Sequence, residues 1–153
     1  ISKFKNGYPD YRFEAITNSN KEDAYKVMLD WCAENEIDIE HYEEKNAIRE
    51  ALDNIEEFKM YGGIVYVKDK AVAMTLGCEI SPIAFDICFE KALREYDGIY
   101  VVINNEFAKT LFSYKYINRE EDMGIEGLKK SKLSYNPIIL IARYNATLKN
   151  DGN

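Results

Sequence analysis

The longest apolar runs in this sequence have only the length of β-strands. They cover residues 99–103 and 137–142, and both are far shorter than the roughly 20 apolar residues that a membrane-spanning helix needs. Other stretches alternate polar and apolar residues, or repeat apolar residues at the spacing of a helix. For a chain of 153 residues we therefore expect one α/β domain with a buried core and no membrane span.

Charge and cysteine content limit the partners and the compartment. The formal net charge is −7, which is the wrong sign for a protein whose main partner is duplex nucleic acid. Cys32, Cys78 and Cys88 are odd in number and lack the close spacing of zinc ligands. We expect reduced thiols, a cytoplasmic location, and neither a disulfide framework nor a metal site.

Two stretches have the apolar spacing of helices. Residues 21–34 follow the polar segment Asn-Ser-Asn at 18–20, which is typical of a helix N-terminus. A second helix is expected at about residues 39–59, ahead of two glycines. Its expected core positions are Ile48, Ala51, Leu52, Ile55 and Phe58.

Strand patterns surround these helices. Residues 11–17 predict a first strand, and residues 64–67 and 71–76 predict a hairpin about a short polar turn. In residues 83–90 apolar and mixed residues alternate, so we expect Phe85, Ile87 and Phe89 on one face and Asp86, Cys88 and Glu90 on the other.

The rest of the chain predicts a helix, a strand, a helix and a final strand. The ranges are 98–114, 114–118, about 125–132, and 138–144. The complete order is βααβββαβαβ, with a mostly antiparallel sheet flanked by helices.

Three segments carry a resemblance to a known family. They are Glu-Lys-Ala at 90–92, Ile-Asn-Asn-Glu-Phe-Ala at 103–108, and residues 116–137, which contain Asn-Arg-Glu-Glu-Asp. With them the chain resembles the C-terminal domain of the bacterial phosphatidylglycerol lysyltransferase family. The resemblance implies a GNAT acyltransferase fold, which has the same element order and usually holds an acyl donor between splayed strands.

The resemblance also implies a second half. Similar family members carry two tandem GNAT-like halves, so we expect residues 1–10 to be a linker from an N-terminal half, which is the main expected partner. Residues 11–146 would form the GNAT-like domain and residues 147–153 a disordered tail. The missing initiator Met agrees with this expectation.

The donor is left open between acetyl-CoA, or another acyl-CoA, and aminoacyl-tRNA. Characterised relatives transfer an aminoacyl group from tRNA to a lipid hydroxyl, whereas ordinary GNAT enzymes bind coenzyme A at a glycine-rich loop. The corresponding residues here, 91–98, contain a single glycine and an acidic Asp97. This departure weakens the acetyl-CoA hypothesis more than the aminoacyl-tRNA hypothesis.

Glu90 is the first catalytic candidate, and Lys91 beside it is a substrate-binding candidate. A carboxylate near a strand end could accept a proton from an attacking amine or hydroxyl. The alternative is a structural ion pair between Glu90 and Lys91 or Arg94.

A charged cluster supplies further substrate-binding candidates. Arg119 could orient an ammonium-bearing substrate together with its neighbours, or it could bridge carboxylates in a purely structural network. We reject a metal there, because no calcium loop or histidine partner is present. The candidates of this cluster are Asn118, Arg119, Glu120 and Asp122.

Tyr135 is the second catalytic candidate. GNAT enzymes often keep a tyrosine in this region that protonates the leaving group, although a tyrosine that satisfies a backbone carbonyl is an equal alternative. Lys132 and Ser134 are candidates for binding an anion. The hypotheses are thus an acyl- or aminoacyltransferase, or a non-catalytic scaffolding half.

Overall fold

The computed structural model describes residues 1–120, 124, 126–142, 144 and 146. The chain divides into two compact units, Ile1–Glu120 and Glu121–Asn153. Each unit is described by itself.

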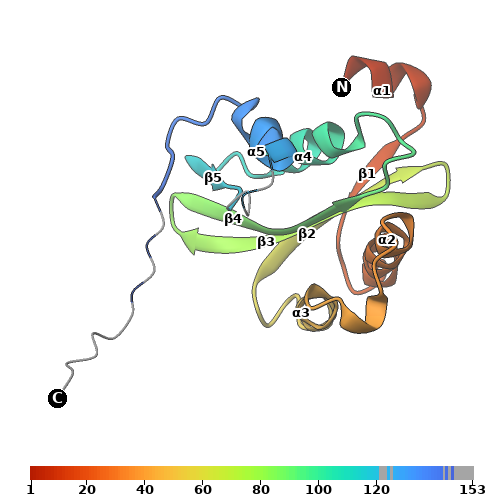
Figure 1. Cartoon of the computed structure of the whole chain (residues 1–153), viewed down its shortest axis with the longest axis horizontal. Helices are drawn as coiled ribbons and strands as arrows, with labels where there is room; N and C mark the ends of the chain where they lie inside the picture. The colour runs from red at the N-terminus through yellow and green to blue at the C-terminus, as the bar shows by residue number, and fades with distance from the viewer. Residues whose placement is uncertain (121–123, 125, 143, 145, 147–153) are drawn as a thin grey trace. The chain divides into compact units, whose positions relative to one another are not determined.

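A five-stranded sheet forms the centre of the first unit (Figure 1). Its strands are β1 Arg12–Ala15, β2 Met60–Val67, β3 Lys70–Ser81, β4 Ala84–Ala92 and β5 Tyr116–Asn118. They lie in sequence order. Each of the first four is antiparallel to its neighbours among them, and β5 is parallel to β4. The expected mostly antiparallel sheet is confirmed.

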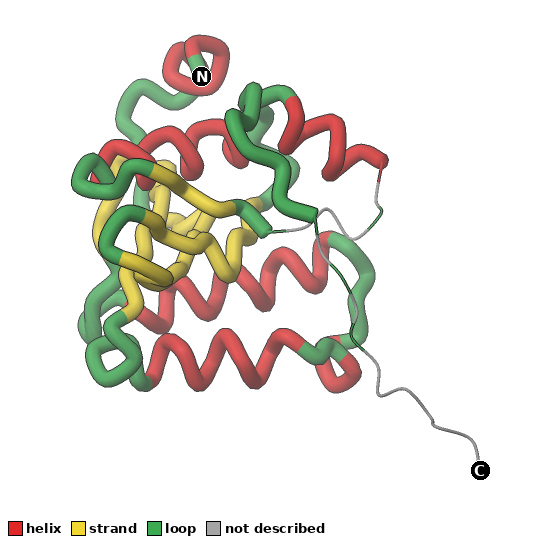
Figure 2. The backbone as a smooth tube through the Cα atoms, turned by 90° about the vertical axis from the view of Figure 1, so that its left-hand side faces the viewer, coloured by secondary structure: helices red, strands yellow, loops and turns green. Residues whose placement is uncertain are grey.

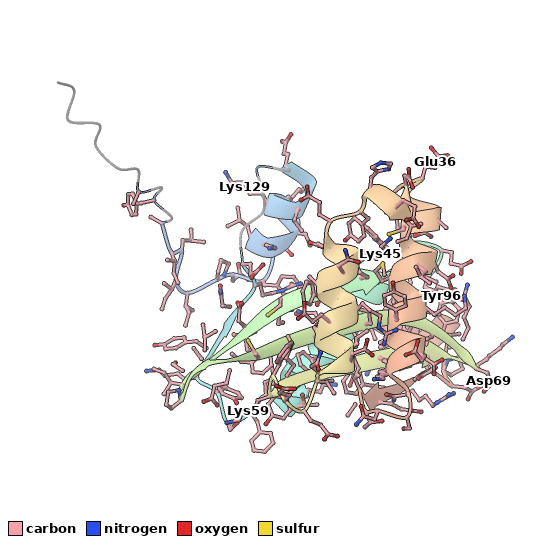
Figure 3. The ribbon with its side chains drawn as sticks, turned by 90° about the horizontal axis from the view of Figure 1, so that it is seen from below. Glu36, Lys45, Lys59, Asp69, Tyr96 and Lys129 are labelled. Carbon is pink, nitrogen blue, oxygen red and sulfur yellow. The ribbon has the colours of Figure 1, made fainter. Side chains whose placement is uncertain are left out.

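Helices α2 (Lys21–Glu34) and α3 (Glu44–Asp53) lie side by side against one face of the sheet (Figures 2 and 3). The prediction of one helix over residues 39–59 was wrong in its limits. A short 3-10 helix, Ile39–His41, precedes α3 because the Asp38 side chain accepts the Glu40 N–H at 3.0 Å, and Tyr42 is then extended. The expected core positions are buried except Phe58, which is 45% exposed.

Helices α1 (Ser2–Gly7) and α4 (Ile99–Thr110) belong to the opposite face (Figure 1). The segment expected to be a linker thus contains a helix, and its Phe4 side chain is buried beside Ile99 and Ile103. Further along α4, Phe107 packs with Phe85 and Ile87 of β4.

A β-bulge interrupts the alternation of β4. Leu76 pairs with Phe89 and Gly77 with Ile87, so Cys88 is an extra residue in the ladder. The sheet is tight here, because a Cβ on Gly77 would lie 2.0 Å from the Asp86 carbonyl oxygen. The expected single apolar row of β4 is therefore wrong beyond Ile87. Phe89 packs on the α2 and α3 face, and Glu90 turns toward α4.

The second unit contains α5, Glu126–Leu133. The strand predicted at 138–144 was wrong for the residues that the structure describes, since 138–142 and 144 have no strand geometry. An apolar run needs a hydrogen-bonded neighbour to become a strand, and here its side chains are exposed, with Ile138 at 81% and Leu140 at 76%. The tail expected at 147–153 lies outside the described residues.

Helices long and apolar enough to cross a membrane are absent from the described part of the chain.

Candidate functional site

The candidate site lies where β4 and β5 separate. The two strands pair only from Ala84 with Tyr116 to Asp86 with Asn118. The Asn118 side-chain amide donates to Asp86 Oδ1 at 2.6 Å, which fastens the last pair. Beyond it β4 continues to Ala92, and the edge of β4 that faces away from β3 has no ladder with β5.

Arg119 spans this separation. It is the first residue after β5, and its Nη2 atom lies 2.6 Å from Glu90 Oε1. The exposed fractions of the side chains are 23% for Arg119 and 11% for Glu90. The structural alternative for Glu90 named Lys91 or Arg94 as its partner, but the structure brings Glu90 to Arg119 instead. Two residues predicted separately as site residues therefore meet.

Thr75 and Asn104 complete a polar group that we name the Glu90 cluster: Thr75, Glu90, Asn104 and Arg119. Thr75 is opposite Glu90 in the β3–β4 ladder and fully buried. The Asn104 amide lies 3.5 Å from Glu90 Oε2. The Thr75 hydroxyl has no hydrogen-bond partner among the described residues, which is unusual for a buried polar atom and needs an explanation.

Tyr100, in the first turn of α4, lies beside the end of β4 that has no ladder with β5. Its hydroxyl accepts a hydrogen bond from Trp31 Nε1 at 3.0 Å and another from the Ala92 backbone. Burial, with a contribution from the charge of Glu90, raises the pKa of Tyr100, so the hydroxyl keeps its proton. A hydroxyl that accepts two hydrogen bonds still has that proton to donate.

The loop between β4 and α4 is where GNAT enzymes bind a pyrophosphate. Here the Glu34 carboxylate, just inside the end of α2, accepts the backbone N–H of Arg94 at 2.9 Å and of Glu95 at 3.2 Å. Gly98 then enters α4 with a φ of +83°. A carboxylate of the chain itself thus binds two backbone donors that a phosphate would need.

Lys91 points to the other face of the sheet. Its ammonium lies 2.7 Å from Glu44 Oε2 and 4.6 Å from the centre of the Trp31 ring. The Tyr42 hydroxyl donates to the same carboxylate. The structure therefore does not bring Lys91 together with Glu90, although the two are neighbours in sequence.

The remaining predicted site residues are Glu120, Asp122, Lys132, Ser134 and Tyr135. The Glu120 N–H donates to the Asn118 side chain at 3.3 Å, and Asp122 lies outside the described residues. Tyr135, Lys132 and Ser134 belong to the second unit, where the Ser134 hydroxyl donates to the Ser131 carbonyl at 2.6 Å. No group of metal-ligating side chains occurs among the described residues.

Comparison with known protein families identifies the family of this chain. The family described as phosphatidylglycerol lysyltransferase, C-terminal, matches residues 1–147. The chain belongs to this family. A conserved protein of unknown function from Bacteroides thetaiotaomicron is 41% identical to this chain, with a TM-score of 0.85. The match covers 92% of the chain but 48% of that protein, so the domain spans about half of its relative.

More distant structures show the fold class of this chain. A ribosomal-protein-alanine N-acetyltransferase from Brucella melitensis has a TM-score of 0.60 at 10% identity, covering 93% of this chain and 99% of its own. AAC(6')-Iy, in complex with a CoA-S-monomethyl-acetylneamine bisubstrate analogue, has a TM-score of 0.65 at 9% identity, covering 92% and 98%. The GNAT-like fold is confirmed. Comparison with curated proteins gave no match.

Four residues of the site were missed by the sequence reasoning: Glu34, Thr75, Tyr100 and Asn104. Asn104 had a usable signal, because it interrupts the apolar face of a helix and is four residues from Tyr100, which puts both on one side. Thr75 and Glu34 had none, since each is unremarkable within its own element and the residues that each one faces are distant in sequence.

Proposed function

We propose that this domain transfers an acyl group, and specifically an aminoacyl group, to an amine or hydroxyl acceptor beside Glu90. The observation that carries the proposal is the Glu90 cluster, in which buried Thr75 and Asn104 adjoin the partly buried pair of Glu90 and Arg119 at the point where β4 and β5 separate. The GNAT-like fold supports it, because this fold usually holds an acyl donor between these two strands.

The reaction assigns a role to each neighbouring group. The acceptor nitrogen or oxygen attacks the carbonyl carbon of the donor, the acceptor's proton passes to Glu90, and the bond from the carbonyl carbon to the leaving oxygen breaks. The leaving oxygen takes the proton of Tyr100, and Glu90 then returns its proton to Tyr100. Arg119 holds the Glu90 carboxylate in position throughout. Tyr135 stays a second candidate for the proton donor.

Glu34 favours an aminoacyl ester over an acyl-CoA as the donor. A pyrophosphate at the β4–α4 loop would have to displace the Glu34 carboxylate from the N–H groups of Arg94 and Glu95. Asp97 on the same loop is a further acidic residue, and its carboxylate is paired with the Lys3 ammonium at 2.5 Å. An ester of tRNA does not require a pyrophosphate at this loop.

Thermal unfolding with ligands tests the donor. A ligand that binds only the folded state at about 100 times its Kd stabilises that state by about 2.7 kcal/mol. We expect charged tRNA to raise the melting temperature of the chain, or of the tandem protein to which we propose it belongs, and acetyl-CoA to leave it unchanged. Stabilisation by acetyl-CoA alone would contradict the aminoacyl donor.

A variant of Glu34 sharpens this test. Glu34→Ala releases the N–H groups of Arg94 and Glu95, so we expect it to gain a melting response to coenzyme A that the native chain lacks. Glu36→Ala is the matched control, since Glu36 lies beyond the end of α2 (Figure 3) and lacks these contacts. An equal response in both variants would show that Glu34 does not exclude the pyrophosphate.

One observation favours a scaffolding half instead. The described residues form two surface pockets near the end of α3 and the start of β2, and neither is lined by the Glu90 cluster. One, of about 350 Å³, is lined by Ile16, Thr17, Ile55, Glu56, Lys59, Met60 and Tyr61, and the other includes Asn18 and Asp53. If neither tRNA nor coenzyme A changes the melting temperature of the chain or the tandem protein, the non-catalytic hypothesis replaces the transferase.

A further inference from the structure

Two of the three cysteines meet on the sheet close to the bulge. Cys78 of β3 and Cys88 of β4 have their sulfur atoms 4.0 Å apart, and both side chains are partly exposed. Cys88 Sγ also lies 3.8 Å from Asp86 Oδ2. The third cysteine, Cys32, is buried against Met28 in the core.

The bulge explains why the two sulfurs lie close together, and it also determines which way the Glu90 side chain points. Cys88 is the extra residue of β4, and the register of the ladder changes between Leu76 and Gly77. The same insertion turns Glu90 from the face of Cys88 to the face of α4, where it reaches Arg119. Because Cys88 is the inserted residue, a change in its position should also change the direction in which the Glu90 side chain points.

We propose that Cys78 and Cys88 are a reversible redox modification site, oxidised to a disulfide by a hydroperoxide, and that oxidation alters the bulge that directs Glu90. A disulfide requires the sulfurs to approach by about 2 Å from their present separation. Rotation of the two side chains and movement of the bulge residue supply that approach. The inference is independent of the proposed transfer reaction.

The chemistry proceeds in two balanced steps. The Cys78 sulfur attacks one oxygen of the hydroperoxide, whose O–O bond breaks, and the products are a Cys78 sulfenic acid and water or an alcohol. The Cys88 sulfur then attacks the Cys78 sulfur, the S–O bond breaks, and the hydroxyl leaves with the Cys88 proton as water. Burial and the neighbouring Cys78 and Asp86 raise the pKa of Cys88 to about 12, so its thiol keeps its proton and does not begin the attack on the hydroperoxide. Cys88 enters only in the second step, where the Cys78 sulfur lies beside it.

Peptide mapping after peroxide treatment tests the site. The folded protein is exposed to hydrogen peroxide, unfolded, and alkylated with N-ethylmaleimide. We expect one crosslinked peptide that joins residues 78 and 88 within a single chain, with Cys32 alkylated. Cys32→Ser should give the same crosslink. Cys88→Ser should instead leave a Cys78 sulfenic acid that dimedone traps.

Amide hydrogen exchange tests the effect on the bulge. Oxidation should change the exchange rates of residues 87–91 in the native protein, reverse with dithiothreitol, and leave Cys78→Ser unaffected. The inference is overturned if Cys78 and Cys88 are both alkylated after treatment, or if the crosslink joins two chains. Unchanged exchange in residues 87–91 of the crosslinked protein would overturn the link to Glu90.

Discussion

The two faces of the sheet are filled differently. On the face of α2 and α3, one apolar cluster extends from Ile16 to Leu76. On the face of α1 and α4 there are two clusters, and polar residues lie between them. Along β4, Glu90 separates Ile87 of one cluster from Ala92 of the other.

Helix α4 shows the same division. Asn104 lies between Ile103 of one cluster and Phe107 of the other. Buried polar groups cost free energy unless they are well paired, so a core selected for stability alone would be apolar here. The α2 and α3 face therefore contributes mainly stability, whereas the α4 face gives up some stability for the Glu90 cluster.

Glu90→Gln should have the largest effect on the transfer rate, because Glu90 is the central residue of the α4 face. Loss of a positioned proton acceptor typically lowers a rate by about 10²–10⁴-fold, roughly 3–5 kcal/mol of barrier. We expect that loss in the proposed aminoacyl transfer rate per folded molecule of the proposed tandem protein. Glu36→Gln, an exposed carboxylate beyond α2, is the control. A Glu90→Gln protein with the native rate would remove Glu90 from the mechanism.

Leu52→Ala should strongly lower stability and leave the transfer rate unchanged. Leu52 is fully buried between α3 and the sheet, and such truncations cost about 2–5 kcal/mol of unfolding free energy. Urea unfolding measures the loss. The transfer rate per folded molecule should stay native, and a fall in that rate comparable to the Glu90→Gln effect would mean that the two faces are not functionally distinct.

Thr75→Val should raise stability modestly. Valine has nearly the same shape and removes a buried hydroxyl that has no partner among the described residues, so we expect unfolding free energy to increase by about 1 kcal/mol. Thr110→Val is the matched control with the opposite sign, because the Thr110 hydroxyl donates to the Phe107 carbonyl at 2.7 Å. Destabilisation by Thr75→Val would show that its hydroxyl is satisfied in solution.

The sequence predicted the elements better than their contacts. Periodicity located α2, α4 and the β2–β3 hairpin, because each pattern is local. The bulge was not predictable, since an extra residue such as Cys88 leaves no mark in the alternation. The strand expected at 138–144 failed because an apolar run does not specify its neighbour.

The candidate site was predicted only in part, again because its contacts join residues that are far apart in the sequence. Glu90 and Arg119 were both singled out, but their pairing across 29 residues was not. Lys91 shows the converse, since its type suggested ligand binding while its long-range neighbours, Glu44 and Trp31, occupy its ammonium. Residue type predicts what a side chain can do, and long-range packing determines which partner it meets.

The smallest expected effect concerns Lys91 and tests whether its role is structural. Burial alone would raise the pKa of Glu44, but the hydrogen bonds from Lys91 and Tyr42 outweigh it, so the pKa lies below the ordinary value. A carboxyl with a lowered folded-state pKa adds stability above its unfolded pKa and loses it as pH falls through the folded pKa. The contribution should therefore be present at neutral pH and be lost only as the pH falls below the ordinary value of 4.5 and through the lowered folded-state pKa. Because the Glu44 side chain is 44% exposed, we expect it to be less than about 1 kcal/mol.

Lys91→Met should flatten the fall in stability between neutral and acidic pH. Urea unfolding at both pH values measures this difference, and Lys26→Met is the control because the Lys26–Asp30 pair is an exposed contact within α2. A native slope in Lys91→Met would show that Lys91 does not stabilise the Glu44 carboxylate. If the variant also lost its melting response to charged tRNA, Lys91 would act on the ligand despite facing away from Glu90, and the functional division between the two faces would fail at this residue.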